Sequence, residues 1–183
     1  DDNTLVIIDG AYQEYASFKD DLKNINPYDL ISKYKNTIYL GTFSKAYGLG
    51  GMRIGYGIAQ DNIINSLLKL RPPFNITNLS LQAAIEVLND ESFVNDCIAK
   101  NFEQMIRYEE YIVKRGFSFI DSYTNFITLK FNNNIKSCYI FQKLLENGII
   151  VRNLKSYGLN AIRITIGKDE ENTKLFNILD NIL

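Results

Sequence analysis

The side chains best suited to chemistry lie in one glycine-rich stretch of the sequence. From Gly41 to Gly55, five glycines surround Ser44, Lys45 and Arg53. Glycine lets a backbone turn tightly and approach a ligand closely. Serine and arginine both bind phosphate oxygens, and a lysine just beyond a buried strand can attack an aldehyde as an amine nucleophile. The stretch therefore indicates a site of this kind or, as the plainer alternative, a glycine-rich turn with a solvated lysine, since it is neither a Walker loop nor a GxGxxG.

Three short apolar segments are expected to position these groups. Unbroken apolar runs are typical of strands buried on both faces of a parallel sheet. A crossover that includes residues 28–34 fits between the first two runs. Ligands bind beyond the carboxyl ends of strands in such sheets, which predicts that Asp9 and the Ser44-Lys45 pair lie at that edge. The three predicted strands span residues 5–8, 37–40 and 53–58.

The rest of the chain changes from helices to a mixture of helices and strands. Helices are predicted over residues 61–70, 78–88 and 91–115, with Pro72-Pro73 and Gly116 as stop signals. Strands follow at 117–120, 126–131, 149–152 and 161–166, and helices at 137–146 and 169–182. The predicted fold class is α/β, with an α/β segment over residues 1–80, connecting helices over 81–116 and a small α+β domain over 117–183.

Composition narrows the possible chemistry. Among 183 residues, 46% are hydrophobic and the net charge is −1, which gives no electrostatic signal for nucleic acid, and no apolar run is long enough for a membrane span. The sequence has no histidine, which removes Ser-His-Asp and Cys-His catalysis and nearly all zinc enzymes, so no metal site is expected. Cys97 and Cys138 are isolated, which favours a reduced cytoplasmic compartment.

The stretch from Thr42 to Tyr56 resembles the lysine signature of the fold-type-I, class II pyridoxal-phosphate-dependent aminotransferases, especially the histidinol-phosphate aminotransferases. In that signature an arginine follows the lysine by eight residues, as Arg53 follows Lys45. The resemblance implies that Lys45 forms a Schiff base with pyridoxal 5'-phosphate and later moves the proton between substrate and cofactor. It also implies that Ser44 and Arg53 bind the cofactor phosphate, with help from Thr42.

A second segment, Asp9-Gly10-Ala11-Tyr12, resembles the Asp-Glu-Ala-Tyr of the same family. The resemblance implies that Asp9 pairs with the pyridine nitrogen of the cofactor and that Tyr12 hydrogen-bonds to the ring hydroxyl oxygen. Gly10 departs from the family's glutamate, which puts a nearby supporting contact in doubt. Taken alone, Asp9 is also compatible with an ordinary turn residue at a strand end.

The third matching region lies near the C-terminus and contains Arg152 and Arg163. Arg163 is flanked by Ile162 and Ile164, and an arginine in an apolar strand needs an anion or a buried acid. The sequence alone leaves open an ion pair within the protein. The resemblance implies that Arg163 holds the α-carboxylate of the substrate and that Arg152 binds a substrate phosphate.

The resemblance covers essentially this whole chain but only the C-terminal half of the family's chain. It implies a homodimeric parent enzyme that transfers an amino group between histidinol phosphate and 2-oxoglutarate in histidine biosynthesis, with the isolated fragment inactive. Two alternatives stay open: another enzyme of the subgroup, such as a threonine-phosphate decarboxylase or an aromatic aminotransferase, or a non-catalytic α+β interaction module. Truncation also predicts bare strand edges and a less stable N-terminal segment.

Overall fold

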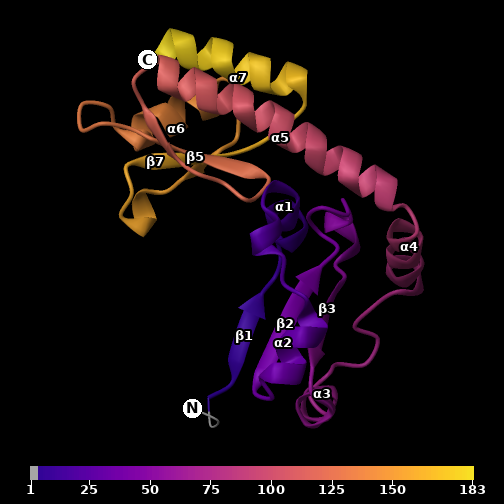
Figure 1. Cartoon of the computed structure of the whole chain (residues 1–183). Helices are drawn as coiled ribbons and strands as arrows, with labels where there is room; N and C mark the ends of the chain where they lie inside the picture. The colour runs from indigo at the N-terminus through magenta and orange to yellow at the C-terminus, as the bar shows by residue number, and fades with distance from the viewer. Residues whose placement is uncertain (1–3) are drawn as a thin grey trace. The chain divides into compact units, whose positions relative to one another are not determined.

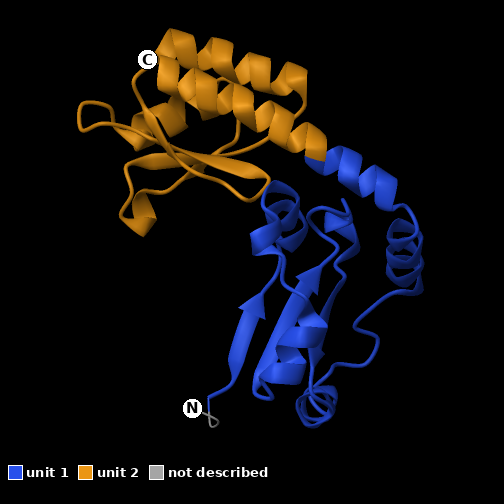
Figure 2. Cartoon of the chain, viewed as in Figure 1, with its two compact units in different colours: residues 1–98 blue, residues 99–183 orange. Residues whose placement is uncertain are grey.

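The computed structural model describes residues 4–183, so the first three residues of the predicted N-terminal segment lie outside the described part. The chain forms two compact units, residues 1–98 and residues 99–183 (Figure 2). The division falls within one long helix, α5 (Glu91–Lys114), which contributes residues to both units. Each unit has its own sheet.

The first unit contains a three-stranded sheet in the order β1-β2-β3 (Figure 1). The strands are β1 (Val6–Asp9), β2 (Thr37–Thr42) and β3 (Gly55–Ala59). β1 and β2 are parallel, as expected, and their connection crosses over through helices. β3 is antiparallel to β2, a departure from the expected parallel sheet. The short connection from β2 to β3 contains no crossover helix, and a parallel pair would need one.

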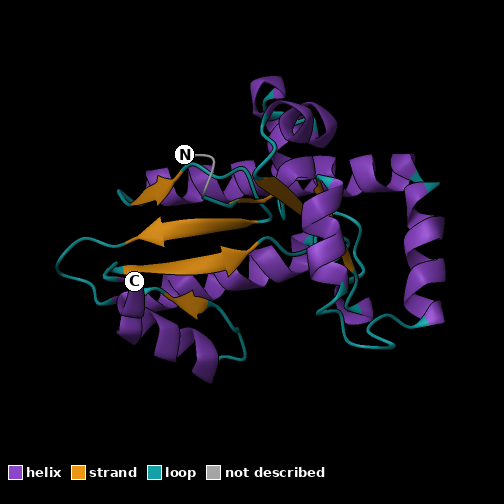
Figure 3. Cartoon of the chain, turned by 90° about the horizontal axis from the view of Figure 1, so that it is seen from below, coloured by secondary structure: helices purple, strands orange, loops and turns teal. Residues whose placement is uncertain are grey.

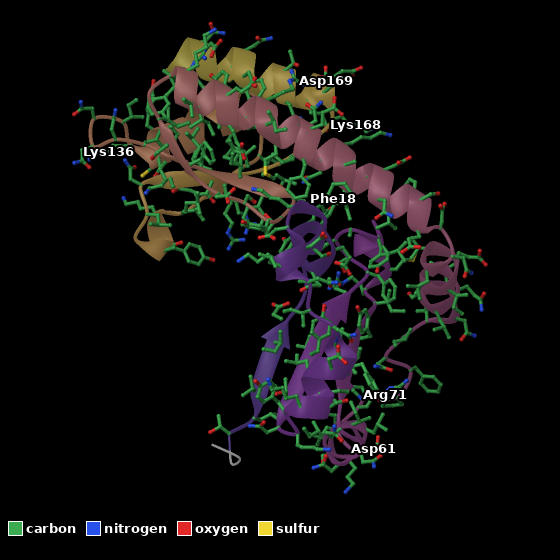
Figure 4. The ribbon with its side chains drawn as sticks, viewed as in Figure 1. Phe18, Asp61, Arg71, Lys136, Lys168 and Asp169 are labelled. Carbon is green, nitrogen blue, oxygen red and sulfur yellow. The ribbon has the colours of Figure 1, made fainter. Side chains whose placement is uncertain are left out.

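The helices of this unit flank its strands. Asn26 caps α2 by accepting a hydrogen bond from Tyr28 N, and Pro27 occupies the first turn, where its missing N–H costs nothing. Thr77 caps α4 in the same way through Ser80 N. Asp61, labelled in Figure 4, begins α3, as predicted. The helices are α1 (Gln13–Lys19), α2 (Pro27–Lys33), α3 (Asp61–Leu68) and α4 (Asn78–Leu88), with short 3-10 turns η1 (Asp21–Lys23) and η2 (Gly50–Met52).

Burial in the first sheet differs between its strands. Ile38 and Tyr39 of β2 are almost completely buried, whereas Leu5 and Ile7 at β1 are 51% and 59% exposed. The prediction that the first strand is buried on both faces is therefore wrong for this chain. β1 is an edge strand, and among residues 4–183 only β2 pairs with it. Its exposed apolar residues agree with the expectation of a bare strand edge.

The second unit packs three helices against an antiparallel sheet (Figures 1 and 3). The sheet has four strands in the order β4-β5-β7-β6. Alternate residues of the central strands, such as Ile127, Leu129 and Ile162, join a core with Met105 and Leu175 from the helices. The elements are β4 (Ser118–Ile120), β5 (Phe126–Lys130), α6 (Ser137–Glu146), β6 (Arg152–Asn153), η3 (Lys155–Tyr157), β7 (Ala161–Thr165) and α7 (Asp169–Ile182).

The predicted strand over residues 149–152 is largely wrong, because β6 contains only Arg152 and Asn153. Helix α6 ends in a turn at Gly148, whose φ is 75°, and Ile149 N donates back to Leu144 O at 2.9 Å. Because of these contacts, residues 148 and 149 form the turn that ends α6 and do not join the sheet. Ile150 is consequently 85% exposed.

Helices α5 and α7 are joined by polar contacts as well as by the core. Asp169 at the start of α7, labelled with Lys168 in Figure 4, accepts a hydrogen bond from Arg107 of α5. Buried Asn172 accepts from Tyr108 Oη at 2.8 Å and donates to Gln104 Oε1 at 3.0 Å. Because each polar group has a partner, burial of this cluster is compatible with a stable core.

Candidate functional site

Lys45 lies on a tight turn directly after β2. Gly48 N donates to Lys45 O at 3.0 Å, and the positive φ of Gly48, 70°, suits a residue without a Cβ. We call residues 45–48 the lysine turn. It is anchored at its start, where Ser44 N donates to Thr42 Oγ1 at 3.1 Å. The half-buried Lys45 is thus held at the carboxyl end of the central strand, where the sequence placed it.

Arg53 and Ser44 come together beside the lysine turn. Arg53 Nη1 lies 3.5 Å from Ser44 Oγ and donates to Gly50 O at 2.9 Å. Arg53 has a left-handed backbone, with φ 52°, which is strained for a residue that carries a Cβ. No acidic side chain in the described part of the chain forms an ion pair with it. A hydroxyl and an exposed guanidinium without a counter-ion can receive an anion such as a phosphate.

Asp9 and Tyr12 flank the same edge of the sheet. Asp9 ends β1, the strand parallel to β2, so the two carboxyl ends meet there. Its exposed carboxylate accepts a hydrogen bond from Ala11 N at 3.0 Å. Tyr12 precedes α1, and the Lys45 ammonium nitrogen lies 5.3 Å from the centre of its ring. The structure therefore brings together the candidates that the sequence identified from its first three strands.

Gly10 has a packing reason to be glycine. A Cβ built at Gly10 would lie 2.3 Å from the Tyr39 ring, and Tyr39 itself is only 2% exposed. The Tyr39 ring of β2 therefore fills the space that any side chain at position 10 would need. Burial, followed by the nearby Tyr56 and Glu14, raises the pKa of Tyr39 to about 12, so its hydroxyl stays neutral at physiological pH.

Two further residues near the site, Glu14 and Tyr47, have no role in the sequence interpretation. Glu14 belongs to the seven-residue helix α1, which the sequence did not predict because its pattern is too short to show a period. Tyr47 lies within the glycine-rich stretch, but from the sequence its aromatic ring is equally compatible with a core position. No local sequence pattern singles them out, because the contact joins segments that are distant in the sequence.

The two C-terminal arginines lie on one face of the second sheet. Arg152 of β6 and Arg163 of β7 are directly opposite each other in the register. Like charges in such a cross-strand pair repel each other. Arg152 Nη2 donates to Tyr157 Oη at 3.1 Å, and the Arg163 guanidinium lies 4.7 Å from the Phe126 ring centre.

The alternative of an ion pair within the protein is wrong for the described residues. Neither Arg152 nor Arg163 has an acidic partner among residues 4–183. Two facing cations without a counter-ion form a surface that an anionic ligand would stabilise.

Comparison with known proteins extends these observations. The model of the family described as aminotransferase class I and II matches residues 1–179. The chain belongs to this family. The predicted family is therefore confirmed, and the lysine turn lies within the matched region.

Individual relatives agree with the family match. Histidinol-phosphate aminotransferases from Aliarcobacter butzleri and Wolinella succinogenes are 67% and 60% identical to this chain over all 183 residues. Those 183 residues are 50% of each relative, so the chain spans about half the length of the curated relatives it matches.

A solved structure shows the same fold. The histidinol-phosphate aminotransferase of Sinorhizobium meliloti, in complex with pyridoxal-5'-phosphate, is 28% identical and superposes with a TM-score of 0.89, covering 100% of this chain and 49% of that chain. The predicted α/β fold class is thereby confirmed. Among residues 4–183, every helix is too short or too polar to span a lipid bilayer.

Proposed function

We propose that this chain carries the lysine, phosphate-binding and substrate-binding residues of a pyridoxal-phosphate-dependent histidinol-phosphate aminotransferase. The observation that carries the proposal is the cluster at the lysine turn. Arg53, held in a strained backbone and lacking an acidic partner in the described residues, lies beside Ser44 and one turn from Lys45. Such strain is commonly retained at functional sites. The names and identities of the relatives support the choice of reaction.

The residues present fit pyridoxal phosphate. Arg53 and Ser44 would hold its phosphate, with Thr42 fixing the backbone at Ser44 through the hydrogen bond to Ser44 N. Asp9 would pair with the ring nitrogen, and the Tyr12 hydroxyl with the ring oxygen. When bound, the cofactor supplies an aldehyde for covalent attachment and a ring that accepts electrons from the substrate α-carbon.

The protein's own groups would carry the proton transfers. Because the sequence contains no histidine, the Lys45 amine is the candidate that takes the proton from the substrate α-carbon and returns it. Asp9, as a carboxylate, would keep a proton on the ring nitrogen. Tyr12 lies beside the Lys45 amine and would orient it.

Substrate recognition would fall to the facing arginines of the second unit. Arg163 would bind the α-carboxylate that glutamate carries, and Arg152 the phosphate of histidinol phosphate. Stacking on Phe126 and hydrogen bonding to Tyr157 hold the two guanidinium groups in place. In this proposal 2-oxoglutarate is the amino acceptor, and the reaction serves histidine biosynthesis.

We further propose how the whole protein is organised. Residues 1–80 would belong to the cofactor-binding large domain, residues 81–116 to the connecting helices and residues 117–183 to the small domain. The complete protein would act as a cytoplasmic homodimer on small-molecule substrates, and the 183-residue chain by itself would be inactive.

A substrate panel tests the proposed reaction. A full-length protein that contains this chain is incubated with pyridoxal phosphate, 2-oxoglutarate and one amine at a time. We expect glutamate formation with histidinol phosphate, at a rate well above that with aromatic amino acids, and its loss in Lys45→Ala. Preferred transamination of aromatic amino acids, or release of carbon dioxide from threonine phosphate, would replace the proposal with that alternative. No turnover of any amine would favour the non-catalytic module.

A further inference from the structure

Two neighbouring segments of the first unit contact each other at two matched points. Tyr12 lies beside Lys45, as described above. Two residues further along each segment, Glu14 of α1 and Tyr47 of the lysine turn line the same pocket, and the two side chains are close enough to shift each other's pKa. The pair therefore ties the segment that carries Asp9 and Tyr12 to the turn that carries Lys45.

The Glu14 carboxyl group lies in a position where its burial costs free energy. Its Oε2 atom is buried and has no hydrogen-bond partner among residues 4–183. Burial raises the pKa of Glu14, while its own backbone N–H and the nearby Tyr47 hydroxyl act in the opposite direction. A poorly solvated carboxyl group costs free energy unless its position serves another purpose.

Tyr47 is fixed on its other side by the core. Its ring packs against Phe43, 5.1 Å between centres, and Phe43 forms a buried cluster with Ile54 and Ala84. Burial and the charge of Glu14 raise the pKa of Tyr47 to about 12, so the hydroxyl remains a donor at physiological pH. A ring packed on the core and a hydroxyl beside Glu14 of α1 restrict the positions open to the lysine turn.

We propose that Glu14 and Tyr47 are positioning residues that set the place of the Lys45 amine for attachment of an aldehyde cofactor. The inference rests on the proposed function and adds residues to which the family resemblance assigned no role. Attachment joins Nζ of Lys45 to the aldehyde carbon as a C=N bond, with the aldehyde oxygen leaving as water. Without the Glu14–Tyr47 contact the turn would sample more conformations, so the amine would spend less time at the aldehyde carbon.

The test compares two forms of the cofactor in the full-length protein. Pyridoxal phosphate can attach to Lys45, whereas pyridoxamine phosphate has an amine in place of the aldehyde and cannot. For Glu14→Ala and Tyr47→Phe we expect about 10-fold weaker binding of pyridoxal phosphate and a change of less than about 2-fold for pyridoxamine phosphate. Glu14→Gln keeps an acceptor for the tyrosine hydroxyl and should bind both forms nearly as the wild type does.

Controls separate this role from a general loss of structure. Tyr28→Phe and Glu86→Gln remove a hydroxyl and a charge from exposed positions of the same unit and should change neither affinity. The double variant Glu14→Ala/Tyr47→Phe should be no weaker than either single variant, because both break one contact. Equal weakening of both cofactor forms, or unchanged binding in both single variants, would overturn the positioning role. A wild type that binds both forms equally, with no effect of Lys45→Ala, would instead contradict the proposed function.

Discussion

Arg152 and Arg163 face each other across neighbouring strands, and this repulsion is the main evidence at the residue scale for an anionic substrate. We predict that Arg152→Ala raises the KM for histidinol phosphate more than that for glutamate. The expected loss in kcat/KM for histidinol phosphate is about 2 kcal/mol, at the lower end for a charged contact because Arg152 is exposed. Steady-state kinetics of the full-length enzyme with each substrate measures it. Equal losses for both substrates would refute the division of labour between the arginines.

Gly10 illustrates how one residue depends on its neighbour across the sheet. We predict that Gly10→Ala destabilises the protein by about 1–3 kcal/mol, because the new Cβ would overlap the buried Tyr39 ring. Urea unfolding of the full-length protein measures the change. Gly51→Ala is the matched control, since a Cβ there meets no atom within 4 Å. If the clash is the cause, Gly10→Ala should hardly change the free energy of unfolding in a Tyr39→Leu background. An undiminished loss of stability in that background would contradict the clash.

At the scale of elements, the second unit depends on the buried contact between α5 and α7. We predict that Asn172→Ala lowers the free energy of unfolding by about 3 kcal/mol, because it leaves the Tyr108 hydroxyl and the Gly167 backbone groups without partners. Urea unfolding followed by tyrosine fluorescence measures it in a chain with 12 tyrosines and no tryptophan. Asn177→Ala, on the exposed side of the same helix, should change the free energy by less than about 0.5 kcal/mol. Similar effects of the two substitutions would contradict the account.

Long helices with a regular hydrophobic repeat were predicted from the sequence, whereas the shortest helix and strand were not. The predicted bounds of α4, α6 and α7 agree with the structure. Helices α6 and α7 each place an apolar stripe on a core, whereas α4 leaves most of its large apolar side chains exposed. Helix α1 and strand β6 were missed or misplaced. Their seven and two residues are shaped by contacts with other segments, which no local pattern records.

The part of the candidate site that was predictable consists of reactive residues that lie close together in the sequence. Lys45, Ser44 and Arg53 share one local stretch, so their types and order were enough to single them out. The antiparallel direction of β3 and the fit of Tyr39 over Gly10 were not predictable, because both depend on which strands become neighbours. The same holds for Glu14, whose contact with Tyr47 joins residues 33 positions apart.

At the scale of the whole molecule, the two units should differ in stability. Within residues 4–183, β1 pairs only with β2, and Leu5 and Ile7 are exposed there, whereas the second unit packs three helices and its central strands into one core. We predict faster amide hydrogen exchange in residues 1–60 than in residues 117–183 of the monomeric 183-residue chain. Exchange measured by mass spectrometry decides this. Equal protection of the two regions would show that the first unit is a complete domain in this chain.

Covalent trapping of the cofactor at Lys45 shows whether this lysine is the attachment site. The full-length protein is incubated with pyridoxal phosphate, treated with borohydride to reduce any C=N bond, digested and analysed by mass spectrometry. We expect the peptide containing Lys45 to carry the reduced cofactor and Lys45→Ala to abolish the modification. Lys69→Ala, at an exposed lysine of the same unit, should leave it unchanged. An unmodified Lys45 in the wild type, or modification spread equally over other lysines, would contradict this expectation.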